Sequence, residues 1–165
     1  MKTRSKVILD EWIGRLIVNV LNLFARILGK ILGINHSFDK IPERIVVCKF
    51  LGMGSIIQAT PLLQTLRQSF PNSQIYFVTS KANEILLKKT LSVNDVWCVD
   101  DKNIFSVISS TFKVLNKLWK KKIDLYIDLE TYSYYSTAVA TLSLSRNRLG
   151  FYRAERNIRL GVYTH

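Results

Sequence analysis

The strongest constraint on the fold is the alternation of short apolar runs with longer segments of helical spacing after residue 44. Strands that alternate with helices are joined by right-handed crossovers, which produce a mostly parallel sheet. Strands that are apolar along their whole length are typical of a sheet that helices cover on both faces. The sequence therefore predicts an α/β, Rossmann-like domain over residues 44–165. The expected strands are RIVVCKF (44–50), QIYFVTS (74–80), DVWCV (95–99), DLYIDL (124–129) and RLGFY (148–152), and the expected helices lie at about 56–69, 82–89, 104–121 and 132–145.

A different pattern occupies residues 1–38, where apolar residues recur at helical spacing from Leu9 to Leu32. Basic residues form a narrower stripe along the same segment. The longest stretch without charge, 16–25, is far shorter than the roughly 20 residues that a bilayer-spanning helix needs. Acidic residues interrupt the basic start and no small-residue cleavage site follows, so the segment does not resemble a signal peptide. We expect an amphipathic helix followed by a linker.

This helix has two interpretations. In the first it lies in the membrane interface, with its apolar face among the acyl chains and its basic residues at the lipid phosphates. In the second it packs on the domain or on a second subunit. In the membrane interpretation the chain is a peripheral protein, and because Cys48 and Cys98 lie in apolar runs that favour a reducing, cytoplasmic compartment, we expect it on the inner face of the cytoplasmic membrane. Its predicted contact residues are Trp12 and Phe24, which insert, and Arg15, Arg26 and Lys30, which face lipid phosphates.

The charge balance indicates an anionic partner. The 165-residue chain has 24 Lys and Arg against 12 Asp and Glu, which gives a net charge of +12. Nucleic acids, phospholipid head groups and phosphorylated sugars all carry the required negative charge. Because the basic residues are not interleaved with aromatic residues on a recognisable nucleic-acid-binding element, no nucleic-acid partner is expected. The 2 cysteines and 2 histidines predict neither a disulfide framework nor a metal site.

Ligands of parallel sheets bind beyond the carboxyl ends of the strands, which directs attention to the turn after the first strand. This turn contains Lys49, Gly52, Gly54 and Ser55. It matches neither a Walker loop nor a complete dinucleotide-binding fingerprint. Glycines at this place let the backbone approach a ligand closely, although they also suit a plain tight turn.

Two carboxylates, Asp128 and Glu130, stand at the end of the fourth expected strand. A carboxylate in this place is a candidate general base. Alternatively, Glu130 begins the next helix and Asp128 pairs with a nearby N–H group or lysine.

A third candidate group is the arginine-rich tail, because arginine suits bidentate recognition of phosphate or carboxylate. The tail contains Arg146, Arg148, Arg153, Arg156 and Arg159.

Several of these motifs together resemble the glycosyltransferase family 9 proteins, the heptosyltransferase-like enzymes of lipopolysaccharide assembly. The matching elements are the Gly52–Gly54 turn, Thr60-Pro61-Leu62-Leu63, Phe70-Pro71, the DLYIDL strand and the Arg-Leu-Gly-Phe segment at 148–151. The resemblance covers residues 44–165. It implies that this part is the N-terminal, acceptor-binding domain of a GT-B enzyme, which pairs with a C-terminal domain that binds a nucleotide-sugar donor.

The resemblance also implies roles for individual residues. The family's turn ends in Gly-Asp, and that aspartate is the proposed base, whereas this chain has Ser55 at the matching position. Either Glu130, the favoured candidate, or Asp128 has then taken the role of base, or the activity is altered or lost. The family's anion-binding residues map near Arg153 and Arg156, and Lys49, Gly52, Gly54 and Ser55 would line the acceptor cleft. No metal or other cofactor is implied, because the donor is a co-substrate.

The chain is about half as long as a GT-B enzyme, so the donor-binding domain is expected to be missing. The implied function is the acceptor-binding part of a transferase that modifies lipopolysaccharide or another surface glycan and is inactive alone. The expected partners are an anionic glycan or glycolipid acceptor, the membrane surface and the missing domain. The alternative is a non-catalytic membrane-surface module derived from such an enzyme.

Overall fold

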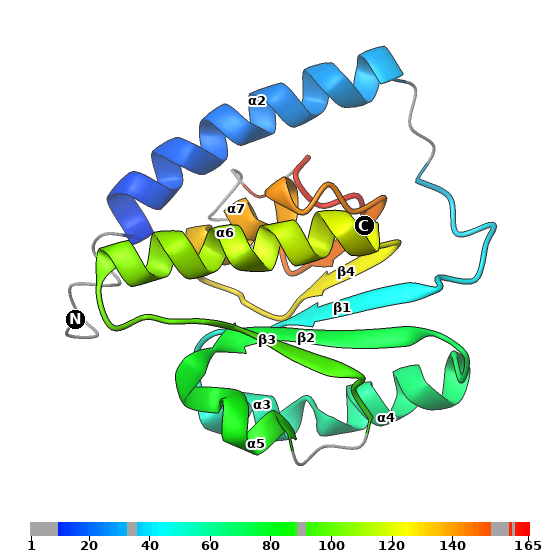
Figure 1. The fold of residues 1–165 in the computed structure, drawn as a ribbon. Helices are drawn as coiled ribbons and strands as arrows, with labels where there is room; N and C mark the ends of the chain where they lie inside the picture. Colours follow the sequence, from blue (N-terminus) through cyan, green and yellow to red (C-terminus); the bar gives the residue numbers. More distant parts are fainter. Residues whose placement is uncertain (1–9, 33–35, 89–91, 153–158, 160) are drawn as a thin grey trace.

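The computed structural model describes residues 10–32, 36–88, 92–152, 159 and 161–165. Its centre is a single sheet of five parallel strands in the order β3-β2-β1-β4-β5 (Figure 1). The predicted α/β, Rossmann-like sheet is therefore confirmed. The strands are β1 (Arg44–Cys48), β2 (Gln74–Ser80), β3 (Asp95–Val99), β4 (Leu125–Asp128) and β5 (Asn147–Gly150).

Helices cover both faces of the sheet, as the apolar strands predict. Figure 1 shows α2, α6 and α7 on one side and α3, α4 and α5 on the other. The first group comprises α2 (Arg15–Leu32), which follows a π-helical turn η1 (Asp10–Gly14), α6 (Ile104–Lys121) and α7 (Tyr134–Leu142). The second group comprises α3 (Met53–Gln58), α4 (Thr60–Ser69) and α5 (Glu84–Lys88), which follows a 3₁₀ turn η2 (Lys81–Asn83).

Two predicted helices differ from the observed ones. The helix expected at 56–69 is divided into α3 and α4, with Ala59 between them. Pro61 stands in the first turn of α4, where its missing N–H group and fixed φ suit a helix start and cannot continue the preceding helix. The helix expected at 82–89 begins as the 3₁₀ turn η2 and becomes α-helical only at Glu84.

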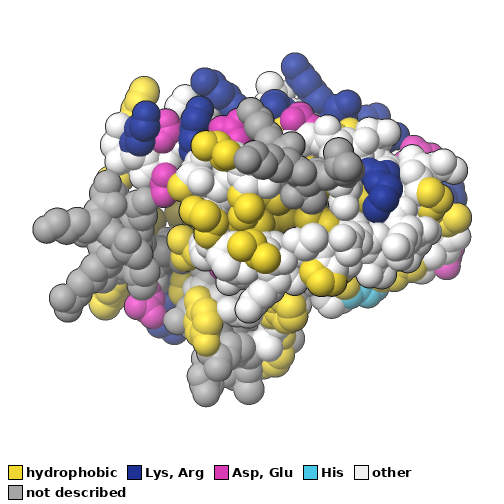
Figure 2. Space-filling model, turned by 90° about the horizontal axis from the view of Figure 1, so that it is seen from below, with side chains coloured by type: hydrophobic (Ala, Val, Ile, Leu, Met, Phe, Trp, Pro, Cys, Tyr) yellow, Lys and Arg dark blue, Asp and Glu magenta, His cyan; other side chains and the backbone are white. Residues whose placement is uncertain are grey.

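Alternate residues of the strands contribute to two separate cores. In β1, Ile45 and Val47 belong to the cluster that α3, α4 and α5 cover, and Val46 and Cys48 to the cluster that α6 and α7 cover. All four side chains are completely buried. The face covered by α3, α4 and α5 also carries exposed apolar side chains, which gather across its middle in Figure 2.

Helix α2 packs on α7 through the narrower of its apolar surfaces. The fully buried Val18 contacts a cluster that includes Tyr134, Ala138 and Val162. Most of the apolar side chains that the structure describes on α2 are exposed, so the most apolar side of this helix is not the side that holds it to the domain. Among the described residues, no helix is both long and apolar enough to cross a membrane. The exposed large apolar residues of η1 and α2 are Trp12, Ile13, Leu16, Ile17, Val20, Leu23, Phe24, Ile27 and Ile31.

The last described residues return to β5. The backbone N–H group of Thr164 donates to the carbonyl oxygen of Arg148 at 2.9 Å. The ring of Tyr163 lies over Gly150, where a Cβ atom would approach three ring carbons to 2.4–2.6 Å. The absence of a side chain at position 150 therefore allows this segment to close on the sheet.

We predict that Gly150→Ala lowers the free energy of unfolding by about 1–3 kcal/mol, the usual cost of overpacking a buried contact. Urea denaturation followed by circular dichroism measures the change. Gly54→Ala is the matched control, because a Cβ atom at Gly54 meets nothing within 4 Å and alanine favours a helix. An unchanged midpoint for Gly150→Ala would mean that Tyr163 does not pack on β5 in solution.

Candidate functional site

Lys49 and Glu130 meet at the carboxyl edge of the sheet, because each follows the end of one of two adjacent parallel strands, β1 and β4. Oε2 of Glu130 lies 3.0 Å from Nζ of Lys49, and the two side chains are 4% and 11% exposed. Oε1 of Glu130 accepts hydrogen bonds from the backbone N–H groups of Phe50 and Leu51, at 2.9 and 2.7 Å. Glu130 therefore ties the start of the glycine-rich turn to the end of β4.

The same segment is also held from the β2 side. The hydroxyl group of Thr79 donates to the carbonyl oxygen of Lys49 at 2.7 Å, and the side-chain amide of Asn83 donates to that of Phe50 at 3.0 Å. Ser80 donates a further hydrogen bond to the carbonyl oxygen of Phe50. Side chains from both neighbouring strands thus fix the backbone of residues 49–51 just before the glycines.

The glycine-rich turn leads directly into α3. Gly52 has a φ of 85°, in the left-handed region that favours glycine. A Cβ atom at Gly52 would also lie 2.9 Å from the hydroxyl oxygen of Ser55. Gly54 and the half-buried Ser55 lie in the first turn of α3. The predicted turn at the end of the first strand is present, although the helix begins three residues earlier than the sequence pattern predicts.

Asp128 is completely buried beside Arg159. Its Oδ1 accepts a hydrogen bond from the backbone N–H group of Glu130 at 2.9 Å. Its Oδ2 accepts from the Tyr163 hydroxyl group and lies 3.3 Å from Nη2 of Arg159. The guanidinium of Arg159 also donates to the carbonyl oxygen of Glu130 at 2.8 Å and to the hydroxyl oxygen of Thr137 at 2.9 Å. Arg159 therefore joins β4, α7 and the C-terminal segment.

Burial dominates the pKa shifts around this cluster. Loss of water raises the pKa of the Asp128 carboxyl group, while the hydrogen bond from Tyr163 and the charge of Arg159 partly offset that rise. Burial and the neighbouring Asp128 also raise the pKa of the Tyr163 hydroxyl group. In the adjacent strand, burial raises the pKa of the Cys48 thiol, which keeps this cysteine protonated and poorly nucleophilic.

The structure brings together only part of the predicted site. Lys49 and Glu130 are in contact, and Asp128 is joined to Glu130 through the backbone. Arg153 and Arg156 lie outside the described residues. Of the predicted membrane contacts, Trp12 is 80% exposed, Phe24 is 58% exposed and Arg15 is exposed. The side chains of Arg26 and Lys30 are outside the described part of the chain.

Sequence reasoning missed the central position of Arg159 and the contribution of Tyr163. In the sequence Arg159 is one of five tail arginines with no motif of its own, and its burial depends on tertiary contacts with Asp128 and Thr137. Tyr163 carries no sequence signal, because an isolated tyrosine near a chain end matches no motif. Its hydroxyl group nevertheless contacts both Asp128 and Thr137.

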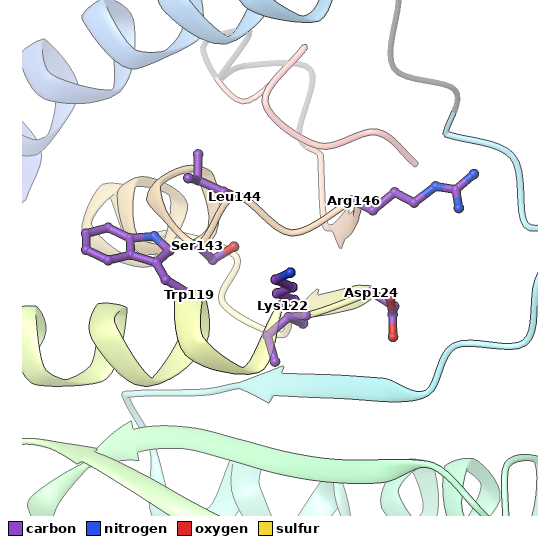
Figure 3. Close-up of a pocket in the computed structure, with 7 residues that line it drawn as sticks. Trp119, Lys122, Asp124, Ser143, Leu144 and Arg146 are labelled. Carbon is purple, nitrogen blue, oxygen red and sulfur yellow. The ribbon is translucent and has the colours of Figure 1, made fainter. Parts of the chain in front are cut away.

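A separate pocket lies at the opposite, amino edge of the sheet, where α6 and α7 end (Figure 3). None of the predicted catalytic or acceptor-binding residues that the structure describes lies in it. The carboxylate of Asp124 accepts hydrogen bonds from the backbone N–H groups of Glu43 and Arg44 and is thus engaged in structure. We therefore place the candidate site at the carboxyl edge. The residues that line this pocket are Trp119, Lys122, Ile123, Asp124, Ser143, Leu144 and Arg146.

Within the described ranges, no group of three or more His, Cys, Asp or Glu side chains is arranged to hold a metal ion. The chemical groups at the carboxyl edge are instead one buried ion pair and one buried Asp–Arg–Tyr network. Such groups hold a proton or position a loop.

Comparison with solved structures identifies proteins with the same fold. A glycosyl transferase family 9 protein from Veillonella parvula is 24% identical, with a TM-score of 0.63 over 71% of this chain and 34% of its own. ADP-heptose LPS heptosyltransferase II of E. coli is 21% identical, with a TM-score of 0.59 over 73% of this chain and 33% of its own. E. coli heptosyltransferase WaaC, solved with ADP-2-deoxy-2-fluoro heptose, is 19% identical, with a TM-score of 0.62 over 74% and 41%.

These similarities confirm the fold implied by the family-9 resemblance. This chain spans between a third and two fifths of the length of those solved proteins. No family model matches the sequence. No curated protein matches it either.

Proposed function

We propose that this chain is the acceptor-binding part of a family-9-type glycosyltransferase that modifies lipopolysaccharide or another surface glycan. The main support is the position of Lys49 and Glu130 at the carboxyl edge of a sheet whose fold is that of heptosyltransferases. The donor is a nucleotide sugar, which a second α/β domain binds. Without that domain the chain has no transferase activity.

In the complete enzyme, Glu130 is the proposed general base. The acceptor hydroxyl oxygen forms a bond to the anomeric carbon of the donor, its proton moves to the Glu130 carboxylate, and the bond to the nucleoside diphosphate breaks. Ser55 cannot take this role at the ordinary pKa of a hydroxyl group. Oε2 of Glu130 pairs with Lys49 and Oε1 holds two backbone N–H groups, so Oε2 is the oxygen that would take the proton as Lys49 moves aside.

Asp128 is the weaker candidate for the base. It is completely buried and its cation, Arg159, is only 2% exposed, whereas the cation of Glu130, Lys49, is 11% exposed and nearer to solvent. Its proposed role is to position Glu130 and Arg159. Arg153 and Arg156 remain proposed ligands of an anionic acceptor group. The turn that contains Gly52, Gly54 and Ser55 is the proposed wall of the acceptor cleft.

The membrane attachment proposed here is through α2, at the inner face of the cytoplasmic membrane. Its support is the exposed apolar face of this helix, which a membrane interface would cover. Arg15 and the aromatic residue Trp12 stand at one end of that face, where an anionic lipid surface would contact both. A lipid-linked acceptor would be presented at the same surface.

A non-catalytic module is the alternative. It is favoured by Ser55 in place of an acidic residue and by the full engagement of the Glu130 carboxylate in holding the turn. In that case the membrane surface would be the partner and no sugar would be transferred.

A fusion of the full chain to the donor-binding domain of WaaC distinguishes the acceptor-binding part of a glycosyltransferase from the non-catalytic module. We expect nucleoside diphosphate release from ADP-heptose only when a membrane glycolipid extract is added. Glu130→Gln should lower that rate by about 10²–10⁴-fold, the usual contribution of a general base. Circular dichroism must show that both fusions are folded at the assay temperature. A folded fusion that releases no diphosphate with any nucleotide sugar of a panel would favour the non-catalytic module.

A further inference from the structure

The outward surface of α6 has a composition that the fold does not explain. Its inward residues Val114, Leu115 and Leu118 are buried against the sheet. Phe105 is 82% exposed and Phe112 is 62% exposed, on the same helix. Soluble domains rarely expose several large apolar side chains in one continuous patch unless something covers it.

These exposed residues form one stripe. Phe105, Ile108, Phe112 and Trp119 are separated by three, four and seven residues. This spacing places all four side chains on one side of a helix. Nε1 of Trp119 donates to the carbonyl oxygen of Leu142 in α7 at 2.7 Å, so the end of the stripe lies beside α7. Helix α2 packs on that same α7, and Figure 1 shows α2, α6 and α7 on one side of the sheet.

A row of lysines borders the stripe on its other side. Nζ of Lys117 lies 5.6 Å from the centre of the Trp97 ring, and Nζ of Lys121 lies 5.7 Å from that of Tyr76. These contacts place the lysine row toward β3 and β2, away from α7. Neither α6 nor α2 contains an acidic residue. The exposed lysines of α6 are Lys113, Lys117, Lys120 and Lys121.

We propose that α6 joins α2 in one membrane-facing surface, and that its partner is an anionic lipid bilayer. An apolar, partly aromatic stripe bordered by lysines is the composition of helices that lie in a membrane interface. A protein partner fits less well, because lysine is depleted from protein–protein interfaces. This inference rests on the membrane attachment proposed for α2 and adds to it a second helix.

Vesicle binding separates the two helices. The full chain and three variants are sedimented with vesicles of phosphatidylglycerol and phosphatidylethanolamine, and with neutral phosphatidylcholine vesicles. The α2 variant is Leu16→Gln/Val20→Gln/Phe24→Gln, and the α6 variant is Phe105→Gln/Ile108→Gln/Phe112→Gln. The control is Ile57→Gln/Ile85→Gln, which removes exposed apolar side chains from the opposite side of the sheet.

We expect the α6 variant to bind anionic vesicles at least about tenfold more weakly than the unmodified chain, because three side chains would no longer leave water. The control should bind as the unmodified chain does, and neutral vesicles should bind little of any variant. If the α2 variant binds weakly but the α6 variant binds normally, only the extension to α6 is wrong. If the unmodified chain does not bind anionic vesicles, the attachment proposed for α2 is wrong as well.

Tryptophan quenching gives a second, independent measure. The chain has 3 tryptophans, and Trp97 is only 2% exposed, so Trp12→Phe leaves Trp119 as the exposed one. Vesicles containing brominated lipids should quench Trp12→Phe strongly and Trp12→Phe/Trp119→Phe weakly. Equal quenching of the two variants would mean that Trp119 stays in water and that α6 does not touch the bilayer.

Gel filtration without lipid excludes a second copy of the chain as the partner if the α6 variant and the unmodified chain elute alike.

Discussion

Glu130→Ala is expected to lower the free energy of unfolding by about 3–5 kcal/mol, the usual effect of removing one partner from a buried ion pair. The substitution leaves the Lys49 ammonium in a site that is 11% exposed, without its counter-charge. It also leaves the backbone N–H groups of Phe50 and Leu51 without their acceptor. Urea denaturation followed by circular dichroism measures the loss.

A double-mutant cycle with Lys49→Met identifies the cause. Methionine keeps the apolar stem of lysine but removes the charge that Glu130 neutralises. The double variant Lys49→Met/Glu130→Ala should therefore lose less stability than the sum of the two single variants, by about 1 kcal/mol or more. Strict additivity would show that the two charges do not interact in solution. The cycle also separates the positioning of the turn from catalysis, since it requires no substrate.

Arg159→Met is expected to have an effect of similar size, about 3–5 kcal/mol, because it leaves the completely buried Asp128 without its cation. It also removes the donors that contact the carbonyl oxygen of Glu130 and the hydroxyl group of Thr137. We expect limited proteolysis to become faster than in the unmodified chain, since Arg159 contacts Asp128, Thr137 and Tyr163 and so joins β4, α7 and the last described residues.

Two further variants test the argument for Arg159. Arg159→Lys keeps the charge but not the planar group with five donors, so it should restore only part of the stability. Arg15→Met, which removes an exposed arginine of α2, should change the free energy of unfolding by less than about 0.5 kcal/mol. If Arg159→Met and Arg15→Met unfold at the same urea concentration, the buried network does not contribute to stability.

The strand segments and their parallel arrangement could be predicted from the sequence because they depend on local patterns. A run such as RIVVC is apolar on both sides, and only a sheet covered on both faces buries both. The predicted helix bounds are wrong where a single residue interrupts the apolar periodicity of a helix. Pro61 divides one expected helix, because proline has no backbone N–H group to donate the next helical hydrogen bond. The spacing of the apolar residues does not reveal this break.

The placement of Lys49 and Glu130 at one edge of the sheet could also be inferred, since parallel strands end on the same side. Their contact could not, because it depends on β1 and β4 being neighbours although β2 and β3 lie between them in sequence. Strand order is decided by long-range packing.

The amphipathic character of residues 10–32 was determined by the sequence alone, because periodicity in a helix follows from its fixed rise and turn. Which side of that helix would be buried was decided only by the tertiary structure. Val18 packs on α7, while Leu16, Val20 and Phe24 remain exposed. Likewise, Arg159 is one of five tail arginines in the sequence, but only the fold shows that it is buried beside Asp128, since burial of a charge requires a partner that the rest of the chain must bring to it.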